Sequence, residues 1–377
     1  MNAILQKNVV SVTLLAAALA ACSTAGGQRV PADAVATVTV PASAETVAVA
    51  TVNADAADDP AIWGAPRGQD VLVGGTRVPG FIAGTDKKAG LYIYGLDGTE
   101  LQFLPDGLLN NVDLRGDIPV DGRPQVVIGA SDRGRMGIAL YRFDPASTDP
   151  ANAVRPWGFV RSDVGEPYGF CLGRLGEELH AVLIGKDGSV RQYRIDTGAG
   201  EGVGTEVRRF AVGSQSEGCV IDDRTGALYI GEEARGVWRY RLAIDGGDQR
   251  SLVQAVDSSG RLVADVEGVT LIRDGERTYL LVSSQGDSAF AVWDVTAADP
   301  LYVGRFRVGA ADGIDAVTGT DGLDAWSGPI GCYPEGLVVV QDDENEGLSQ
   351  NFKLVDWRAV REMLLRPADQ ASSSTSQ

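Results

Sequence analysis

The chain has 377 residues, of which 44% are hydrophobic and 22% charged, so it can bury a sizeable core in one large domain or two ordinary ones. Its formal net charge of −18 argues against nucleic-acid binding, which needs an excess of Lys and Arg, and suits divalent cations or a self-repelling soluble surface. The single histidine excludes a zinc site of several histidines, and in the apolar run LHAVLIG we interpret His180 as a strand residue.

Residues 1–21 are typical of an export signal, with one lysine, an apolar run and a small-residue exit. The motif LAAC, which ends at Cys22, resembles a bacterial lipobox and implies a lipid on that cysteine; an ordinary Ala-rich cleavage site is the alternative. Residues 22–45 are then expected to be the lipobox cysteine and a flexible tether. We expect an outer-membrane lipoprotein, or a periplasmic or secreted protein, that contacts the membrane only through this lipid.

Three series of short segments repeat about every fifty residues between residues 46 and 366. Apolar strands are centred on Val73, Ile128, Ile184, Ile230, Val282 and Val339. Strands with a central aromatic follow at Tyr94, Tyr141, Tyr193, Tyr240 and Trp293. A third series begins at DDPAIW, NVDLRG, PYGFCL, SEGCVI, VEGVTL and PEGLVV. Several strands in each such period are typical of a propeller blade, so we predict an all-β, six-bladed β-propeller over residues 46–366; a plain sandwich does not predict series in phase.

The cysteines and the C-terminal segment are the remaining informative features of the chain. Cys171 and Cys219 occupy similar places in successive segments, so a disulfide bridge and two buried free thiols are both open. Cys332 has no partner in either interpretation, once Cys22 is set aside. Residues 367–377 are low in complexity and are expected to be a disordered tail.

Equivalent positions of the repeats should converge on one ring, because the innermost strands of a propeller surround a central channel. The residues that begin the third series or end the first are rich in carboxylates, and crowded carboxylates are costly without a cation. Oxygen-only ligands select a hard cation, calcium before magnesium. Lysines and an arginine occur at equivalent positions of the repeats, directly after strands of the first series. Together with metal ions, these basic side chains would bind phosphate. For any one acidic run, an ordinary solvated turn is the alternative.

A series of motifs follows in unbroken order over nearly all of residues 46–366: AADDPAIW, DKKAGLYIYGLDG, LLNNVDLRGD, EPYGFCL, SQSEGCVIDD, YIGEE, DVEGVTL, SSQGDSAFAVWD, TDGLD and QNFKLVDW. Through these motifs the chain resembles the β-propeller phytases. It implies a phosphomonoesterase that uses several calcium ions and hydrolyses phytate (myo-inositol hexakisphosphate) or calcium-phytate to lower inositol phosphates, by direct attack of a metal-activated water. It also implies a secreted or periplasmic location, and we expect a monomer.

The resemblance also implies roles for individual residues. The catalytic residues would be Glu217, Lys186, Arg133 and Tyr168. The substrate would be held by Lys87, Lys88, Asn111, Arg133, Tyr168, Lys186 and Gln285. The calcium ligands would be Asp58, Asp59, Asp113, Asp187, Glu217, Glu233, Asp265, Glu267, Asp315, Asp321, Asp342 and Asn345, the last two in structural sites.

This sequence departs from the family pattern at a few positions. Asp187 stands where a glutamate is usual, Gly319 and Gly347 stand where acids are expected, and Glu335 replaces an aromatic residue. These departures leave the acidic ring intact but argue against the structural calcium ion near Asp342.

Two other functions are compatible with the sequence. One is a broader phosphatase or phosphodiesterase that uses the same site, and the other is a propeller that only binds. The mixture of acids with Lys186, Arg133 and Lys87 favours an enzyme, because a scaffold has no need of it.

Overall fold

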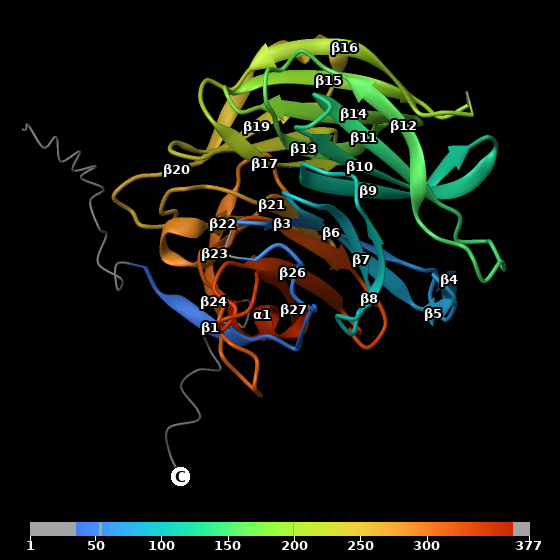
Figure 1. The fold of residues 1–377 in the computed structure, drawn as a ribbon. Coiled ribbons are helices and arrows are strands. Elements are labelled where there is room, and N and C mark those ends of the chain that lie inside the picture. Colours follow the sequence, from blue (N-terminus) through green and yellow to red (C-terminus); the bar gives the residue numbers. More distant parts are fainter. Residues whose placement is uncertain (1–34, 53–54, 199, 365–377) are drawn as a thin grey trace, which may run out of the picture.

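The computed structural model describes residues 35–52, 55–198 and 200–364, which form a six-bladed β-propeller (Figure 1). The predicted fold class and number of blades are confirmed. The export signal, Cys22 and the tail of residues 367–377 lie outside the described residues. Among the residues that are described, no helix is long and apolar enough to cross a membrane.

Each of the first three blades is a sheet of four strands, which run in order from the inner edge to the outer edge. Blade 1 consists of β3 (Ala57–Gly64), β6 (Gly80–Asp86), β7 (Gly90–Tyr94) and β8 (Glu100–Leu104). Blade 2 consists of β9 (Leu109–Val120), β10 (Arg123–Asp132), β11 (Gly137–Phe143) and β12 (Arg155–Arg161). Blade 3 consists of β13 (Pro167–Leu175), β14 (Glu178–Gly185), β15 (Ser189–Asp196) and β16 (Val203–Ala211).

The remaining blades follow the same plan, and the chain ends in a short helix. Blade 4 consists of β17 (Ser216–Asp222), β18 (Ala227–Glu232), β19 (Gly236–Arg241) and β20 (Arg250–Ala255). Blade 5 begins with β21 (Val269–Asp274), β22 (Arg277–Ser284), β23 (Ala289–Asp294) and β24 (Leu301–Gly309). Blade 6 begins with β25 (Leu323–Ser327), β26 (Gly336–Asp342) and β27 (Asn351–Asp356). The helical elements are the 3-10 turns η1 (Ile244–Gly246) and η2 (Gln285–Asp287) and the helix α1 (Trp357–Leu364).

The N-terminal strands complete the last two blades. Strand β1 (Thr37–Pro41) pairs in parallel with β24, beside which it lies in Figure 1, and β2 (Ala44–Glu45) pairs antiparallel with β27. These residues had been assigned to a flexible tether, so the predicted domain boundary at residue 46 was too late. The propeller ring is therefore closed by strands from opposite ends of the chain.

Two members of the predicted repeats belong elsewhere. The segment around Val73 forms a separate hairpin of β4 (Val71–Val73) and β5 (Thr76–Val78), and the second strand of blade 1 is β6. The segment PEGLVV leads into β26, which is a second strand, whereas the inner strand of blade 6 is β25. The motif TDGLD at 320–324 is thus the true equivalent of SEGCVI in blade 4.

The core consists of six hydrophobic clusters, each between two neighbouring blades. Strands β6 and β26 are buried along their whole length, and β14 is buried after its first residue, because a blade covers each face. This explains their continuous apolar sequences. The aromatic series lies on the third strands of blades 1–5, where all five side chains are buried between blades. The repeating aromatics are therefore packing residues.

Two predictions about single residues can be checked in the core. Cys171 on β13 and Cys219 on β17 form a disulfide, which joins the inner strands of blades 3 and 4 and settles the open alternative. His180 is fully buried on β14, and its Nδ1 lies 3.2 Å from Nε2 of Gln192, as expected for a strand histidine that stabilises the core. Cys332 is a free, exposed thiol.

Candidate active site

Strand pairing brings one residue of every blade to the same end of the central channel. In blade 4, for example, Cys219 on the inner strand pairs with Ile230 on the second strand. The residue at the end of the channel is Glu217, two positions before Cys219. The equivalent pairs in the other blades have the same offset. These six positions, which we call the inner ring, are Asp58, Asn110, Tyr168, Glu217, Glu267 and Asp321.

A second set of six residues follows from the same register. Each stands three positions after the second-strand partner, where that strand leaves the sheet. These positions, which we call the exit ring, are Lys87, Arg133, Lys186, Glu233, Gln285 and Asp343. The register therefore selects Lys87 rather than Lys88, and Asp343 rather than Asp342, for the ring.

A glycine after the ring residue lets the inner strands come close together. A Cβ on Gly218 would lie 2.0 Å from the carbonyl oxygen of Glu267, and one on Gly268 would lie 2.8 Å from the carbonyl oxygen of Asp321. Any larger residue would push the neighbouring blades apart. The Glu-Gly and Asp-Gly steps of the sequence thus bring carboxylates of adjacent blades into one site.

Three carboxylates meet where no described lysine or arginine forms a salt bridge with them. Glu217, Glu233 and Glu267 each place an oxygen within 4.8 Å of the other two, and all three side chains are buried. In the part of the chain that the structure describes, none of them has a lysine or arginine within 4.0 Å, and Oε1 of Glu233 and Oε2 of Glu267 have no hydrogen-bond partner. A single point therefore lies within about 2.8 Å of all three oxygens, which is compatible with the 2.3–2.6 Å of calcium–oxygen bonds. We call these three residues the glutamate cluster; they fit a hard cation.

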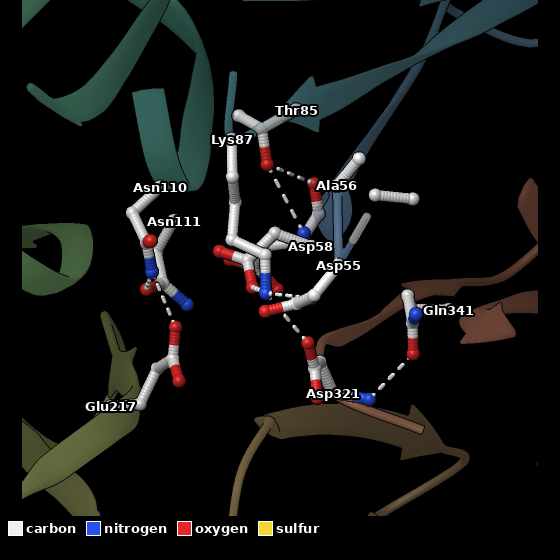
Figure 2. A network of polar contacts seen from close by, with 12 residues as sticks. Asp55, Ala56, Asp58, Thr85, Lys87, Asn110, Asn111, Glu217, Asp321 and Gln341 are labelled. Carbon is white, nitrogen blue, oxygen red and sulfur yellow. Dashed lines mark hydrogen bonds and ion pairs between the residues drawn. The ribbon is translucent and has the colours of Figure 1, made fainter. Parts of the chain in front are cut away.

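The opposite side of the ring contains a buried lysine. Nζ of Lys87 lies 2.6 Å from Asp55, 3.1 Å from Asp58 and 2.9 Å from Asp321 (Figure 2). Figure 2 also shows Asn110, whose amide donates a hydrogen bond to Oε1 of Glu217 across the ring. The ring thus has one half with its own cation and one half without.

Burial dominates the electrostatics of the ring. It raises the pKa of Asp58, Glu233 and Asp321 to about 7 and the pKa of Glu267 well above its usual range. Burial also raises the pKa of Glu217, an effect that the charge of Lys87 opposes. The carboxylates therefore hold protons near neutral pH unless a cation replaces them.

Cationic and polar groups surround the mouth of the ring. The ammonium of the exposed Lys186 lies 5.3 Å from the ring centroid of Tyr168. Arg133 is partly exposed; it donates to the carbonyl oxygen of Lys87 at 3.2 Å and lies 3.8 Å from Glu166. Gln285 donates to Asp321. These side chains, with Lys87, come together as the sequence predicted, and they could hold the oxygens of an anionic substrate.

Other predicted residues lie near the ring with different partners. Lys88 is exposed, and its backbone N–H donates to Asp86. Asn111 is buried beside Asn110, whose amide donates to its Oδ1 at 3.1 Å. Asp265 is partly buried. Burial is the main cause of the raised pKa of Glu233, a hydrogen bond from Gln215 opposes it, and the nearby charge of Asp265 raises the pKa further.

Three predicted metal ligands are used locally instead. Asp59 and Asp113 line a channel cavity of about 300 Å³; Asp59 accepts from the Val112 N–H at 3.2 Å, and Asp113 binds Arg115 at 2.8 Å. Asp187 is exposed in a turn, where it accepts from the Ser189 N–H at 2.9 Å. None of the three joins the glutamate cluster among the described residues.

The last three predicted ligands surround a lysine. Nζ of Lys353 lies 2.5 Å from Asp315, 3.3 Å from Asp342 and 3.4 Å from Oδ1 of Asn345. A positively charged side chain therefore stands where a structural calcium ion was expected.

The sequence prediction does not contain three members of the site. Asn110 and Asp343 occupy ring positions of blades 2 and 6, where the sequence predicted their neighbours Asn111 and Asp342; an alignment of the strand pairs identifies both. Asp55, which lies against Lys87, precedes β3 and carries no repeat signal.

Comparisons with known proteins identify the family of this chain. A family model described as Phytase matches residues 7–372. The chain belongs to the phytase family. A 3-phytase of Bacillus subtilis (strain 168) is similar to this phytase, with 35% identity over 336 residues that cover 86% of this chain and 85% of the relative. The described inner and exit rings all lie within the span of the family model, so the phytase carries its acidic and basic ring residues in the matching domain.

The phytase also resembles solved structures in fold. An α-L-arabinofuranosidase from Fusarium graminearum, solved with an iminosugar inhibitor, aligns with a TM-score of 0.51 over 88% of this chain and 99% of that chain. The sequence identity is 10%, so this likeness shows the fold alone.

Proposed function

We propose that this phytase hydrolyses phytate, or its calcium salt, with calcium ions bound at the glutamate cluster. The observation that carries the proposal is the group of three buried, uncompensated carboxylates next to lysine and arginine side chains. Ligands that are all oxygen suit a hard cation, and irregular geometry favours calcium over magnesium.

The cationic side chains would bind the substrate. Phytate is a polyanion, and a chain with a net charge of −18 repels it unless positive groups line the approach. Lys186 and Arg133 are accessible and stand on neighbouring blades, so each can donate hydrogen bonds to the oxygens of a different phosphate group. Lys87 offsets part of the negative charge on the Asp58 and Asp321 side of the ring, which lowers the repulsion that the reacting phosphate meets.

The cluster glutamates and Tyr168 would form the part of the site where the reaction takes place. Glu217 is held by Asn110 and Tyr168, and Glu233 by Gln215 and Tyr168, so both carboxylates have fixed orientations. When bound there, calcium supplies neutralisation of phosphate oxygens and a lowered pKa for water at the site. Because the ring combines carboxylates with lysine and arginine side chains, we prefer a phosphomonoesterase mechanism in which water attacks the phosphate directly.

Phosphate release tests this proposal against its alternatives. We expect phytate to release phosphate with calcium, to stop in excess EGTA, and to resume on addition of calcium but much less with magnesium. A simple aryl phosphate should react far more slowly, because it cannot bridge several ring cations. Equal rates on both substrates would favour the broader phosphatase, and binding without release would favour the propeller that only binds.

We further propose that the enzyme is exported and acts as a monomer. The Cys171–Cys219 disulfide supports an oxidising compartment, consistent with the export signal expected in residues 1–21 and the lipobox at Cys22. Labelling with radioactive palmitate tests the lipid: a Cys22→Ala variant should lose the label, and an unlabelled wild type would contradict the lipoprotein assignment.

A further inference from the structure

The last blade contains a lysine that is buried completely. Lys353 lies on β27, between β26 and the N-terminal strand β2, and its side chain has no exposed surface. Its ammonium lies 2.5 Å from Oε2 of Glu45, in addition to the three oxygens of Asp315, Asp342 and Asn345. We call these four residues the lysine cage.

The cage collects oxygens from separate segments around one point. Glu45 belongs to β2, Asp315 to the loop before β25, Asp342 to the end of β26, and Asn345 to the loop that follows. The backbone N–H of Thr318 fixes Asp342 at 2.9 Å, and the amide of Asn345 donates to the Ser349 carbonyl oxygen at 2.8 Å. Four oxygens held in this way would otherwise suit a hard metal ion.

The ammonium and a calcium ion cannot share this cage. Calcium would have to lie 2.3–2.6 Å from the same oxygens, and the Lys353 nitrogen already lies 2.5 Å from two of them. Two cations this close in a buried site would also repel each other strongly. The glutamate cluster differs, because none of its residues has a basic group within 4.0 Å in the described part of the chain.

We propose that Lys353 is a built-in cation that replaces a structural calcium ion and locks the closure of the propeller. Its bridge to Glu45 joins the strand that begins the propeller to the blade that ends it. Calcium is then needed at the central ring but not for ring closure. The inference rests on the proposed function in one respect only: that function identifies the ion that the cage excludes as calcium.

Calcium stoichiometry and thermal stability test the inference. Equilibrium dialysis counts the calcium ions bound to the wild type and to Lys353→Met, and calorimetry gives Tm in EGTA and in calcium. We expect the variant to bind one more calcium ion than the wild type. Its Tm in EGTA should fall by on the order of 10 °C, because buried carboxylates lose their partner, and calcium should recover most of that loss. Calcium binding at the central ring is common to both proteins and cancels in the comparison.

A matched control and a second variant keep the test decisive. Lys88→Met, which changes an exposed lysine, should alter neither the calcium count nor Tm in EGTA. Asp315→Asn should leave the calcium count of the wild type unchanged, and this result can be read even if Lys353→Met does not fold. Loss of one calcium ion in Asp315→Asn, or no gain in a folded Lys353→Met, would overturn the inference. A wild type that binds no calcium would instead refute the proposed function.

Discussion

Replacing Glu217 with glutamine is expected to abolish phosphate release while leaving the fold intact. Glutamine has the same shape, and its side-chain oxygen can still accept the hydrogen bond from Asn110. The substitution removes one of the three ionisable groups of the glutamate cluster. In the absence of calcium this relieves repulsion, so the variant in EGTA should be at least as stable as the wild type.

The effect on calcium binding follows from the geometry. An ion between the three oxygens can lie within about 2.8 Å of each, nearer than the 4 Å at which unit charges interact by about 4 kcal/mol at an effective dielectric of 20. Losing one carboxylate should therefore cost at least about 4 kcal/mol, which is about a thousandfold in affinity. At calcium concentrations that saturate the wild type, phosphate release should fall at least about 100-fold.

Isothermal titration with calcium and a phosphate assay measure both effects. Glu232→Gln is the matched control: this buried carboxylate is adjacent to Glu233 in the sequence but binds Ser214 at 2.6 Å and Trp238 at 2.7 Å. The control should keep its calcium affinity within a few-fold of the wild type. A Glu217→Gln enzyme with wild-type calcium affinity and turnover would refute the cluster as the metal site.

Three further results are expected. Burial raises the folded pKa of Asp58, Glu233 and Asp321 to about 7, above the unfolded values near 4, so the metal-free protein should lose stability as pH rises from about 4 to about 7 and change little above that. Tm in EGTA should therefore fall between about pH 5 and 7 and fall less in calcium, and a rise in EGTA over this range would contradict this. Replacing both disulfide cysteines with serine, across a separation of 48 residues, should cost up to about 4 kcal/mol in denaturant unfolding, and an unchanged midpoint would contradict it. Lys186→Met should lower kcat/KM for phytate roughly 10- to 100-fold with an unchanged Tm, since it removes one charged contact from an exposed side chain; unchanged kinetics would remove Lys186 from the substrate site.

The sequence predicts those features that repeat along the chain. Every blade uses the same register, so the phase of Glu217 and Glu267 in the sequence is also their place in the ring. The aromatic series predicted the blades for the same reason. Asp321 was assigned through the family resemblance, and strand pairing now explains its position, because TDGLD begins an inner strand.

Features that depend on contacts between distant segments could not be predicted. Strands β1 and β2 pair with strands about 300 residues later, and nothing in their short sequences specifies those partners. The apolar hairpin near Val73 has the composition of a blade strand but pairs only with itself. Lys353 lies in the ordinary strand sequence NFKLVD, and only the fold shows that four oxygens surround it.

The central claim is that calcium binds between Glu217, Glu233 and Glu267. Anomalous diffraction from crystals of the enzyme soaked in calcium tests it directly. We predict an anomalous peak about 2.3–2.6 Å from an oxygen of each glutamate. An active, calcium-soaked enzyme with no peak among these three carboxylates would contradict the account.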